Sequence, residues 1–309
     1  LTKTGTAALT LNNANTYRGA TTIYQGTVAL GAAGTIDDSP WINIAGGAAT
    51  LDVSAKTGGY TYDGRISGGG NADAAGTAFG SLTSAAKING NVVVGDHVGE
   101  ICLVGSMAPG GNSTTGDIAT AGDQIGHIYT NGNLVFSGEV AGSTPAVPVT
   151  RLSMQLNGAT VNASTLSGWD MTGTWLAANA PDYLNGVNGN LGNHDYLNVG
   201  GDLTLNADGR IVVTNFGTFT PAFGEVFNLI DWGTADFNTF SVNSTLDNGT
   251  GDSAYDLDLP ELSSGLAWDT SLFVSHGSVF IVPEPGRMAL LFIGLLGLCV
   301  RRRRNGRVE

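Results

Sequence analysis

The sequence is poor in charge, cysteine and proline. Of its 309 residues, 13% are charged and nine are proline, and the two cysteines are Cys102 and Cys299. Two cysteines, one of them close to the C-terminus, cannot build a disulfide framework or a cysteine-based zinc site. Lysine and arginine total 13 against 26 acidic residues, which gives a formal net charge of −13.

The charge is distributed unevenly along the chain. Residues 283–309 contain six arginines and two glutamates, so residues 1–282 keep seven basic and 24 acidic side chains, a net charge of −17. Proteins that bind nucleic acid cluster lysine and arginine to meet the phosphates, whereas this body repels them. We therefore exclude nucleic acid as a partner. An acidic body with few lysines and cysteines is typical of exported bacterial proteins.

Glycine is abundant, with 47 residues, and 42% of the chain is hydrophobic. No Gly-X-Y period is present, which excludes collagen, and the apolar content is high enough to bury a core, which argues against disorder. We expect no helix in the body. Short apolar or alternating segments, each closed by Gly, Asn or Asp, recur instead and predict an all-β fold. Examples are residues 8–11, 27–30, 50–53, 92–94, 133–136, 196–199, 202–205 and 210–213.

These strands leave a sandwich, a barrel and a solenoid open. Each segment has only one or two apolar residues for a core, so stacking the strands into a coil buries them more economically. Glycine at the corners supplies the backbone conformations that tight turns require. We therefore favour a parallel β-solenoid, with a β-sandwich as the alternative.

The first thirty residues carry a specific pattern. Leu9 with Leu11 and Val28 with Leu30 form two inward pairs of period two, while Asn15 and Gly19 fall where a turn is needed. The segments that carry the pattern are Leu1-Thr2-Lys3-Thr4-Gly5, Leu9-Thr10-Leu11, Asn15-Thr16-Tyr17, Gly19, Thr21-Thr22-Ile23 and Gly26-Thr27-Val28-Ala29-Leu30. This pattern resembles the autotransporter-associated β-strand repeat of bacterial surface proteins, and the resemblance implies a right-handed parallel β-helix. Because Leu1 falls inside a repeat unit, we expect the sequence to be part of a longer protein.

We predict four regions. Residues 1–66 form the repeat region, and residues 67–190 continue the solenoid with Gly-rich loops. Residues 191–281 form a closing β unit rich in aromatics, which are suitable for capping the open edge of a stacked coil. Residues 282–309 are a tail with a function of its own.

The tail has three parts. Pro283, Glu284 and Pro285 come first, an apolar run from Met288 to Val300 follows, and Arg301, Arg302, Arg303 and Arg304 come last. The run is short for a bilayer, but four arginines directly behind it fit a membrane helix whose basic end stays in the cytoplasm. We predict one short transmembrane helix there, with Met288, Leu291, Ile293, Leu296 and Val300 among its residues, and the arginines as the stop-transfer signal.

This arrangement closely resembles the PEP-CTERM sorting signal of Gram-negative bacteria that make exopolysaccharide. The resemblance implies recognition by an exosortase, a membrane-bound transpeptidase-like enzyme, with cleavage near Pro283–Pro285. The expected partners are therefore the exosortase, exopolysaccharide, and the membrane until the tail is processed. The expected location is the cell surface or the extracellular matrix, after transient anchoring in the inner membrane.

Catalytic or metal-binding patterns are weak. His97, His127, His194 and His276 are scattered and lack the spacing of a metal pair. The densest acidic groups are Asp37-Asp38 and the set Asp252, Asp256, Asp258 and Glu261, without calcium-loop spacing. We expect no metal, no cofactor and no enzymatic activity.

The sequence as a whole predicts an exported structural or adhesive protein. The alternatives are a carbohydrate-active enzyme on the same coil, which needs carboxylates from adjacent turns converging in one groove, and a carbohydrate-binding protein. The latter needs exposed coplanar aromatics, for which Trp169 and Trp175 are the candidates.

Overall fold

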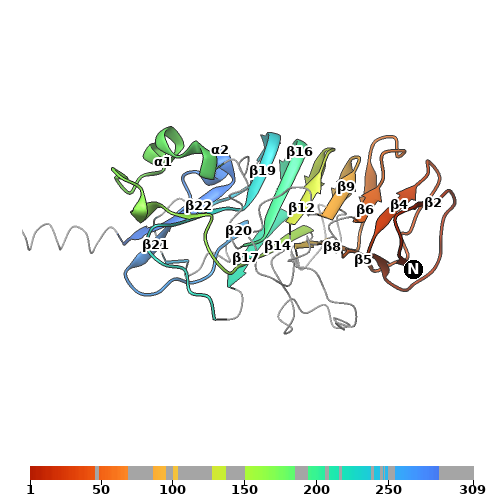
Figure 1. Cartoon of the computed structure of the whole chain (residues 1–309), viewed down its shortest axis with the longest axis horizontal. Coiled ribbons are helices and arrows are strands. Elements are labelled where there is room, and N and C mark those ends of the chain that lie inside the picture. Colours follow the sequence, from red (N-terminus) through yellow and green to blue (C-terminus); the bar gives the residue numbers. More distant parts are fainter. Residues whose placement is uncertain are drawn as a thin grey trace, which may run out of the picture.

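The chain folds mostly into β-strands, which confirms the predicted fold class at that level (Figure 1). The computed structural model describes residues 1–45, 49–68, 86–94, 100–103, 127–136, 150–184, 194–205, 209–215, 218–237, 240–243, 246, 248–249 and 255–284. Within these residues the strands form two large parallel sheets and one small antiparallel sheet.

The first parallel sheet has eight strands, each from the next pass of the chain. Their order is β1 (Thr2–Lys3), β3 (Thr21–Ile23), β5 (Trp41–Ile44), β8 (Arg65–Gly68), β11 (Glu100–Leu103), β14 (Thr150–Leu156), β17 (Gly209–Asn215) and β20 (Leu257–Asp258). The register places one aliphatic residue on the next along the sheet, in the column Ile42, Ile66, Ile101, Leu152, Ile211 and Leu257.

The second parallel sheet has two arms that meet in one long strand, β16 (Tyr196–Leu205). One arm is β2 (Ala8–Leu11), β4 (Gly26–Leu30), β6 (Ala49–Asp52), β9 (Ala86–Asn89) and β12 (His127–Thr130). The other arm is β7 (Tyr60–Tyr62), β10 (Val92–Val94) and β13 (Leu134–Phe136). Strand β19 (Ile230–Asp236) pairs with β16 along both arms, with a register shift between Val199 and Asp202.

Alternation along the strands explains the core. In β4, Gly26, Val28 and Leu30 are buried while Thr27 and Ala29 are partly exposed, so the inward side chains follow the period of two. Successive passes stack these positions, and Figure 1 shows the strands following one another along the long axis. The inward side chains of both sheets join one continuous hydrophobic cluster. Parallel sheets built pass by pass in this way are compatible with a β-helix.

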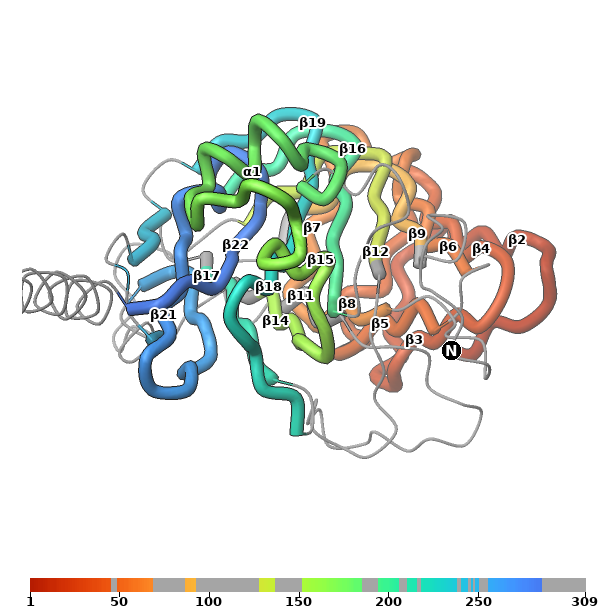
Figure 2. The backbone as a smooth tube through the Cα atoms, turned by 60° about the vertical axis from the view of Figure 1, so that its left-hand side comes forward, coloured from red at the N-terminus to blue at the C-terminus, as the bar shows by residue number. Residues whose placement is uncertain are grey.

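The antiparallel sheet lies at the end of the molecule far from Leu1 (Figure 2). Its order is β15 (Val161–Asn162), β18 (Glu225–Asn228), β22 (Ser278–Pro283) and β21 (Leu266–Asp269). We call this sheet, together with α1 (Gly173–Asn179) and α2 (Phe273–His276), the closing unit. Its strands come from both sides of residue 191, and β16 and β17 continue the parallel sheets, so the predicted boundary at 191 does not coincide with a change of sheet type.

The two helices correct the expectation that the body contains none. The α1 helix begins because the Thr172 hydroxyl accepts a hydrogen bond from the Trp175 N–H at 3.2 Å, an N-cap contact. The α2 helix ends at Gly277, which has φ +64° and whose Cβ, if present, would lie 1.7 Å from the Ile230 carbonyl oxygen. At seven and four residues, both helices are too short to show the 3.6-residue period in the sequence.

The predicted membrane helix cannot be placed, because Met288, Leu291, Ile293, Leu296 and Val300 lie outside the described residues. Within the described part of the chain, no helix combines the length and the hydropathy needed to cross a bilayer.

Candidate functional site

The predicted sorting motif starts where the antiparallel sheet ends. Pro283 is the last residue of β22 and pairs with Leu266, and the Glu284 N–H donates to the Gly265 carbonyl oxygen at 3.1 Å. Both residues are partly exposed. Pro285 and the arginines Arg301, Arg302, Arg303 and Arg304 lie outside the described residues. The closing unit therefore fixes the position from which the tail leaves the body.

His194 is the one histidine that the structure draws into a polar network of the described core. Its Nδ1 donates to the Asp195 carbonyl oxygen at 2.8 Å, and its Nε2 lies 2.7 Å from the Thr160 hydroxyl, which also accepts the Asn228 N–H at 3.0 Å. Because a carbonyl oxygen can only accept, the His194 Nδ1 carries a proton.

A hydroxyl beside an imidazole is also the geometry of a nucleophile and its base. Here, however, His194 and Asp195 are both 0% exposed, and the Asp195 carboxylate accepts the Gln155 N–H at 2.7 Å. The group connects the end of β14 to the closing unit and is closed to substrate. His276 contacts Ser275, the His127 side chain is not described, and His97 lies outside the described residues.

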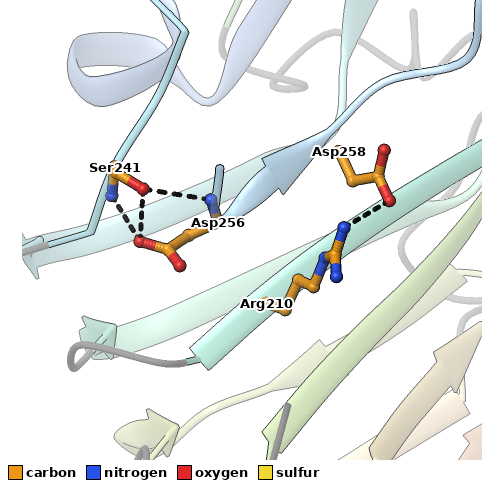
Figure 3. A network of polar contacts seen from close by, with 4 residues as sticks. All are labelled: Arg210, Ser241, Asp256 and Asp258. Atoms are coloured by element: carbon orange, nitrogen blue, oxygen red, sulfur yellow. Dashed lines mark hydrogen bonds and ion pairs between the residues drawn. The ribbon is translucent and has the colours of Figure 1, made fainter. Parts of the chain in front are cut away.

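The acidic residues that sequence analysis singled out have separate partners (Figure 3). Asp258 pairs with Arg210 at 2.8 Å, and Asp256 accepts hydrogen bonds from the Ser241 N–H at 2.6 Å and hydroxyl at 2.8 Å. Asp37 accepts from the Tyr60 hydroxyl at 2.8 Å. Asp252 lies outside the described residues. Asp37, Asp256 and Asp258 thus each have a structural role, and their partners differ.

A second acidic group lies between the parallel stack and the closing unit. The Asp231 carboxylate accepts hydrogen bonds from the Tyr196 hydroxyl and, at 3.2 Å, from the Asn228 amide. Burial raises the pKa of Asp231, and the hydrogen bonds from Tyr196 and Asn228 offset this only in part. Burial and the charge of Asp231 together raise the pKa of Tyr196.

The candidate sugar-binding aromatics pack against the body. Trp169 stacks on Phe223 with centroids 5.6 Å apart, and its edge contacts Phe280 at 6.4 Å, so its faces are turned to other rings. Trp169 and Trp175 are both half-buried against the smaller hydrophobic cluster of the closing unit. This packing does not leave a coplanar pair of free aromatic faces.

An extended polar array lies at a corner where the two arms of the second parallel sheet meet. We call it the corner ladder, and its members are Asn89, Asn91, Asn131, Asn133, Asp202 and Thr234. Side-chain oxygens accept backbone N–H groups of neighbouring passes, from Gly90 to Asn131 at 3.0 Å and from Asp202 to Asn133 at 2.9 Å. The ladder therefore satisfies turn amides that no strand pairs.

A column of glycines lies directly beneath this ladder. An added Cβ on Gly132 would lie 2.3 Å from the Gly90 carbonyl oxygen, and one on Gly201 would lie 2.8 Å from the Gly132 carbonyl. Gly233 continues the series at 3.0 Å from the Gly201 carbonyl oxygen. Only glycine lets these turns stack at the spacing of the parallel strands.

Sequence analysis missed the corner ladder, although a signal for it exists. Residues 89–94 read Asn-Gly-Asn-Val-Val-Val, residues 131–136 read Asn-Gly-Asn-Leu-Val-Phe, and residues 200–205 read Gly-Gly-Asp-Leu-Thr-Leu. The copies are 42 and 69 residues apart, because the connections between passes differ in length, so no constant period reveals them.

The residues of the N-terminal pattern also have structural roles. The buried Lys3 ammonium donates to main-chain carbonyls of Thr4 at 2.9 Å and Gln25 at 3.1 Å, which holds the first turn against the second pass. The Asn15 side-chain amide donates to the Thr35 carbonyl oxygen at 3.0 Å. A Cβ added to Gly19 would have no atom within 4 Å, so the turn there has open space around it. These contacts connect one pass to the next.

The described residues contain no group of three or more His, Cys, Asp or Glu that could hold a metal ion. A cavity of about 460 Å³ in the closing unit is lined by Val242, Leu246, Val274 and the polar run Asp269–Ser271. Its one carboxylate, Asp269, accepts the Ser271 N–H at 2.9 Å. The contacts among the described residues are suited to rigid stacking of chain passes.

Comparison with known proteins gives one family match, over residues 1–30. They match the family model of the passenger-associated-transport-repeat, which confirms the repeat predicted for this segment. Searches of curated proteins and of solved structures give no significant match. The resemblance of residues 283–304 to a PEP-CTERM signal gains no support from these comparisons and stays a prediction.

Proposed function

We propose that this chain is an exported structural or adhesive protein of the bacterial surface or matrix. Its body is a right-handed parallel β-helix, and its tail is a PEP-CTERM signal with one short membrane helix at Met288–Val300. An exosortase recognises the segment Pro283–Pro285 and releases the body from the membrane, after which the body associates with exopolysaccharide and acts without enzymatic activity.

One observation carries the proposal: a passenger-associated-transport-repeat opens a body whose chain passes stack in parallel and are connected by turn contacts. Such a body gains length by adding passes, and each pass needs only its neighbours for stability. The corner ladder in the described residues holds neighbouring passes together. This is a suitable construction for a rigid spacer outside the cell.

The position of the motif supports processing at the tail. Pro283 ends β22 and Glu284 keeps one backbone hydrogen bond to the closing unit, so the motif follows the folded body directly. Both residues are partly exposed. Cleavage after this point removes none of the strands of the body.

Substitution of the motif tests the proposal. In a bacterium that makes an exosortase, we expect the full chain with Glu284→Ala to stay in the membrane fraction with its tail intact, while the parent is released. The matched control is Glu261→Ala, which changes the other Pro-Glu dipeptide, Pro260-Glu261, and leaves the motif unchanged.

We expect the control to be released like the parent, and the parent to behave like Glu284→Ala when the exosortase gene is deleted. Equal release of the parent and Glu284→Ala, with the tail removed from both, contradicts recognition at this motif. Release that does not depend on the exosortase contradicts the proposed partner.

A further inference from the structure

Asparagine followed by glycine is a pair of residues from which a side-chain amide is readily lost. The next main-chain nitrogen attacks the side-chain carbonyl carbon, and glycine favours this attack because no Cβ crowds the ring that forms. Within the described residues such pairs begin at Asn89, Asn131, Asn157 and Asn248. Asn131 is exposed, whereas the other three asparagines are half-buried. Water therefore reaches the pair at Asn131 most freely.

The peptide between Asn89 and Gly90 is held at both of its ends. Asn89 is the last residue of β9, and its carbonyl oxygen accepts the Val53 N–H at 2.7 Å. The Gly90 N–H donates to the Asn131 side-chain oxygen at 3.0 Å. Attack by the Gly90 nitrogen has to break this last hydrogen bond and turn the peptide against the other. The corner ladder thus protects Asn89.

The peptide between Asn131 and Gly132 is held more loosely, and the Asn131 side chain is activated. Asn131 follows the last residue of β12, and the Gly132 N–H makes a long hydrogen bond, 3.3 Å, to the Thr130 hydroxyl. The Gly90 N–H on the Asn131 side-chain oxygen stabilises the negative charge that develops on this oxygen when the carbon is attacked. One hydrogen bond therefore protects the first pair and activates the second.

We propose that Asn131 is a site of spontaneous deamidation, by which the chain modifies its own corner ladder. The Gly132 nitrogen bonds to the Asn131 Cγ, the bond from Cγ to Nδ2 breaks, and ammonia leaves with the proton of the Gly132 amide. Water then opens the cyclic succinimide at either carbonyl carbon and leaves aspartate or isoaspartate at position 131. The reaction needs no oxidant, reductant or cofactor, and the inference does not depend on the tail.

Conversion of Asn131 has a structural consequence. The product lacks the Nδ2 group that donates to the Asn89 side-chain oxygen. In the isoaspartyl form the main chain also gains a methylene group directly before Gly132. A Cβ on Gly132 would already lie 2.3 Å from the Gly90 carbonyl oxygen, so the lengthened turn has to move away from its neighbour. Deamidation therefore opens the stack at this corner.

Peptide mapping of the folded full chain tests the proposal. The chain is purified in a mild detergent and kept at mildly alkaline pH, and isoaspartate is followed at each Asn-Gly pair by mass spectrometry and by an isoaspartyl methyltransferase. We expect Asn131 to convert about tenfold faster than Asn89, since only attack at Asn89 breaks the hydrogen bond of the Gly90 N–H.

Two controls accompany this measurement. In guanidinium chloride the ladder is lost, so both pairs should convert at similar rates. Asn131→Gln keeps an amide at this position but closes the ring poorly, so the isoaspartate signal assigned to position 131 should disappear.

Three results would overturn the proposal. The first is equal conversion of Asn89 and Asn131 in the folded chain, because the ladder would then have no influence. The second is faster conversion at Asn157 or Asn248 than at Asn131. The third is an intact Asn131 in the chain that circular dichroism shows to be folded, under conditions in which the denatured chain reacts.

Discussion

The parallel stack and the closing unit differ in strand direction and in the residues that pack their cores. The stack places mostly aliphatic residues in columns, with the rings of Tyr60, Tyr62 and Phe136 in one arm of the second sheet, and its turns are held by glycine and by the corner ladder. The closing unit is antiparallel and packed by large rings, among which Phe227 contacts Trp268 at 5.7 Å and Phe219 at 6.3 Å. Many similar contacts between neighbouring passes stabilise the stack, and a few large aromatic side chains stabilise the closing unit.

This difference indicates where the molecule is vulnerable. In a stack each pass contributes a small, similar increment, so a conservative change in one column has a limited effect. In the closing unit, one ring bridges several elements, so its loss leaves a large cavity. The following predictions test that contrast, in descending order of effect.

Truncation of a closing-unit ring is expected to have the largest effect. Phe227 is 0% exposed and contacts three other rings, so Phe227→Ala should lower the free energy of unfolding by about 3–5 kcal/mol. In the stack, Ile42→Val should cost about 0.5–1.5 kcal/mol. Urea denaturation followed by circular dichroism measures both, and equal losses would remove the contrast.

A methyl group in the glycine column should be the most damaging small change in the stack. Gly132→Ala drives a Cβ into the Gly90 carbonyl and should cost about 1–3 kcal/mol. Gly19→Ala is the matched control, because a Cβ there has no atom within 4 Å. Thermal unfolding of the two variants should separate them clearly, and identical midpoints would show that the turns are not tightly stacked.

Removal of one amide from the corner ladder should have a smaller effect. Asn131→Ala deletes the hydrogen bonds to Asn89 and from the Gly90 N–H, at an exposed position where water replaces them. We expect a loss of about 1 kcal/mol, together with faster amide exchange at Gly90. Unchanged exchange at Gly90 would show that the ladder does not hold the turn.

Two carboxylates should respond to pH with opposite signs, and this is the smallest expected effect. Burial opposes ionisation of both, but hydrogen bonds from Ser54 and Asn89 outweigh it at Asp52 and lower its pKa, whereas burial dominates and raises the pKa of Asp231. The folded state thus releases the Asp52 proton more readily than the unfolded chain and holds the Asp231 proton more tightly.

Asp52 therefore contributes stability that is lost as the pH falls through its lowered pKa, and Asp52→Asn should reduce the loss of stability in acid. Ionisation of Asp231 lowers the free energy of unfolding as the pH rises from the pKa of the unfolded chain through the raised pKa of the folded state. Asp231→Asn should therefore remove part of this loss of stability with rising pH. Unfolding free energies measured from pH 3 to 7 give both slopes. Slopes of the same sign would contradict the two assigned environments.

The sequence was sufficient for part of the stack and insufficient for the closing unit. Strands such as β8 and β14 were not predicted. Period-two alternation identified residues 8–11 and 27–30, and the same residues carry the family match. The antiparallel sheet pairs β15 with β18 across more than sixty residues, and no local pattern encodes such a pairing. The helix α1 depends on a single N-cap at Thr172, a signal too weak to stand out.

The side-chain contacts could be predicted only where both residues lie on one strand. Tyr60 and Tyr62, two residues apart, are inward and stacked at 6.0 Å, as their spacing allows. The role of Asp258 depends on Arg210, which is 48 residues away and becomes its neighbour through the register of β17 and β20. The role of Asp256 depends on Ser241, which is 15 residues away and lies on neither of those strands. Adjacent acids in a sequence therefore did not predict a shared site.

Intact mass and C-terminal peptide mapping of the protein recovered from the medium or cell surface of its native bacterium test the central claim most directly. The account predicts a chain that ends close to Pro283–Pro285, with the parallel stack and the closing unit complete. A surface form that continues through Glu309 would contradict processing of the tail, and recovery of the protein from the cytosol alone would contradict export.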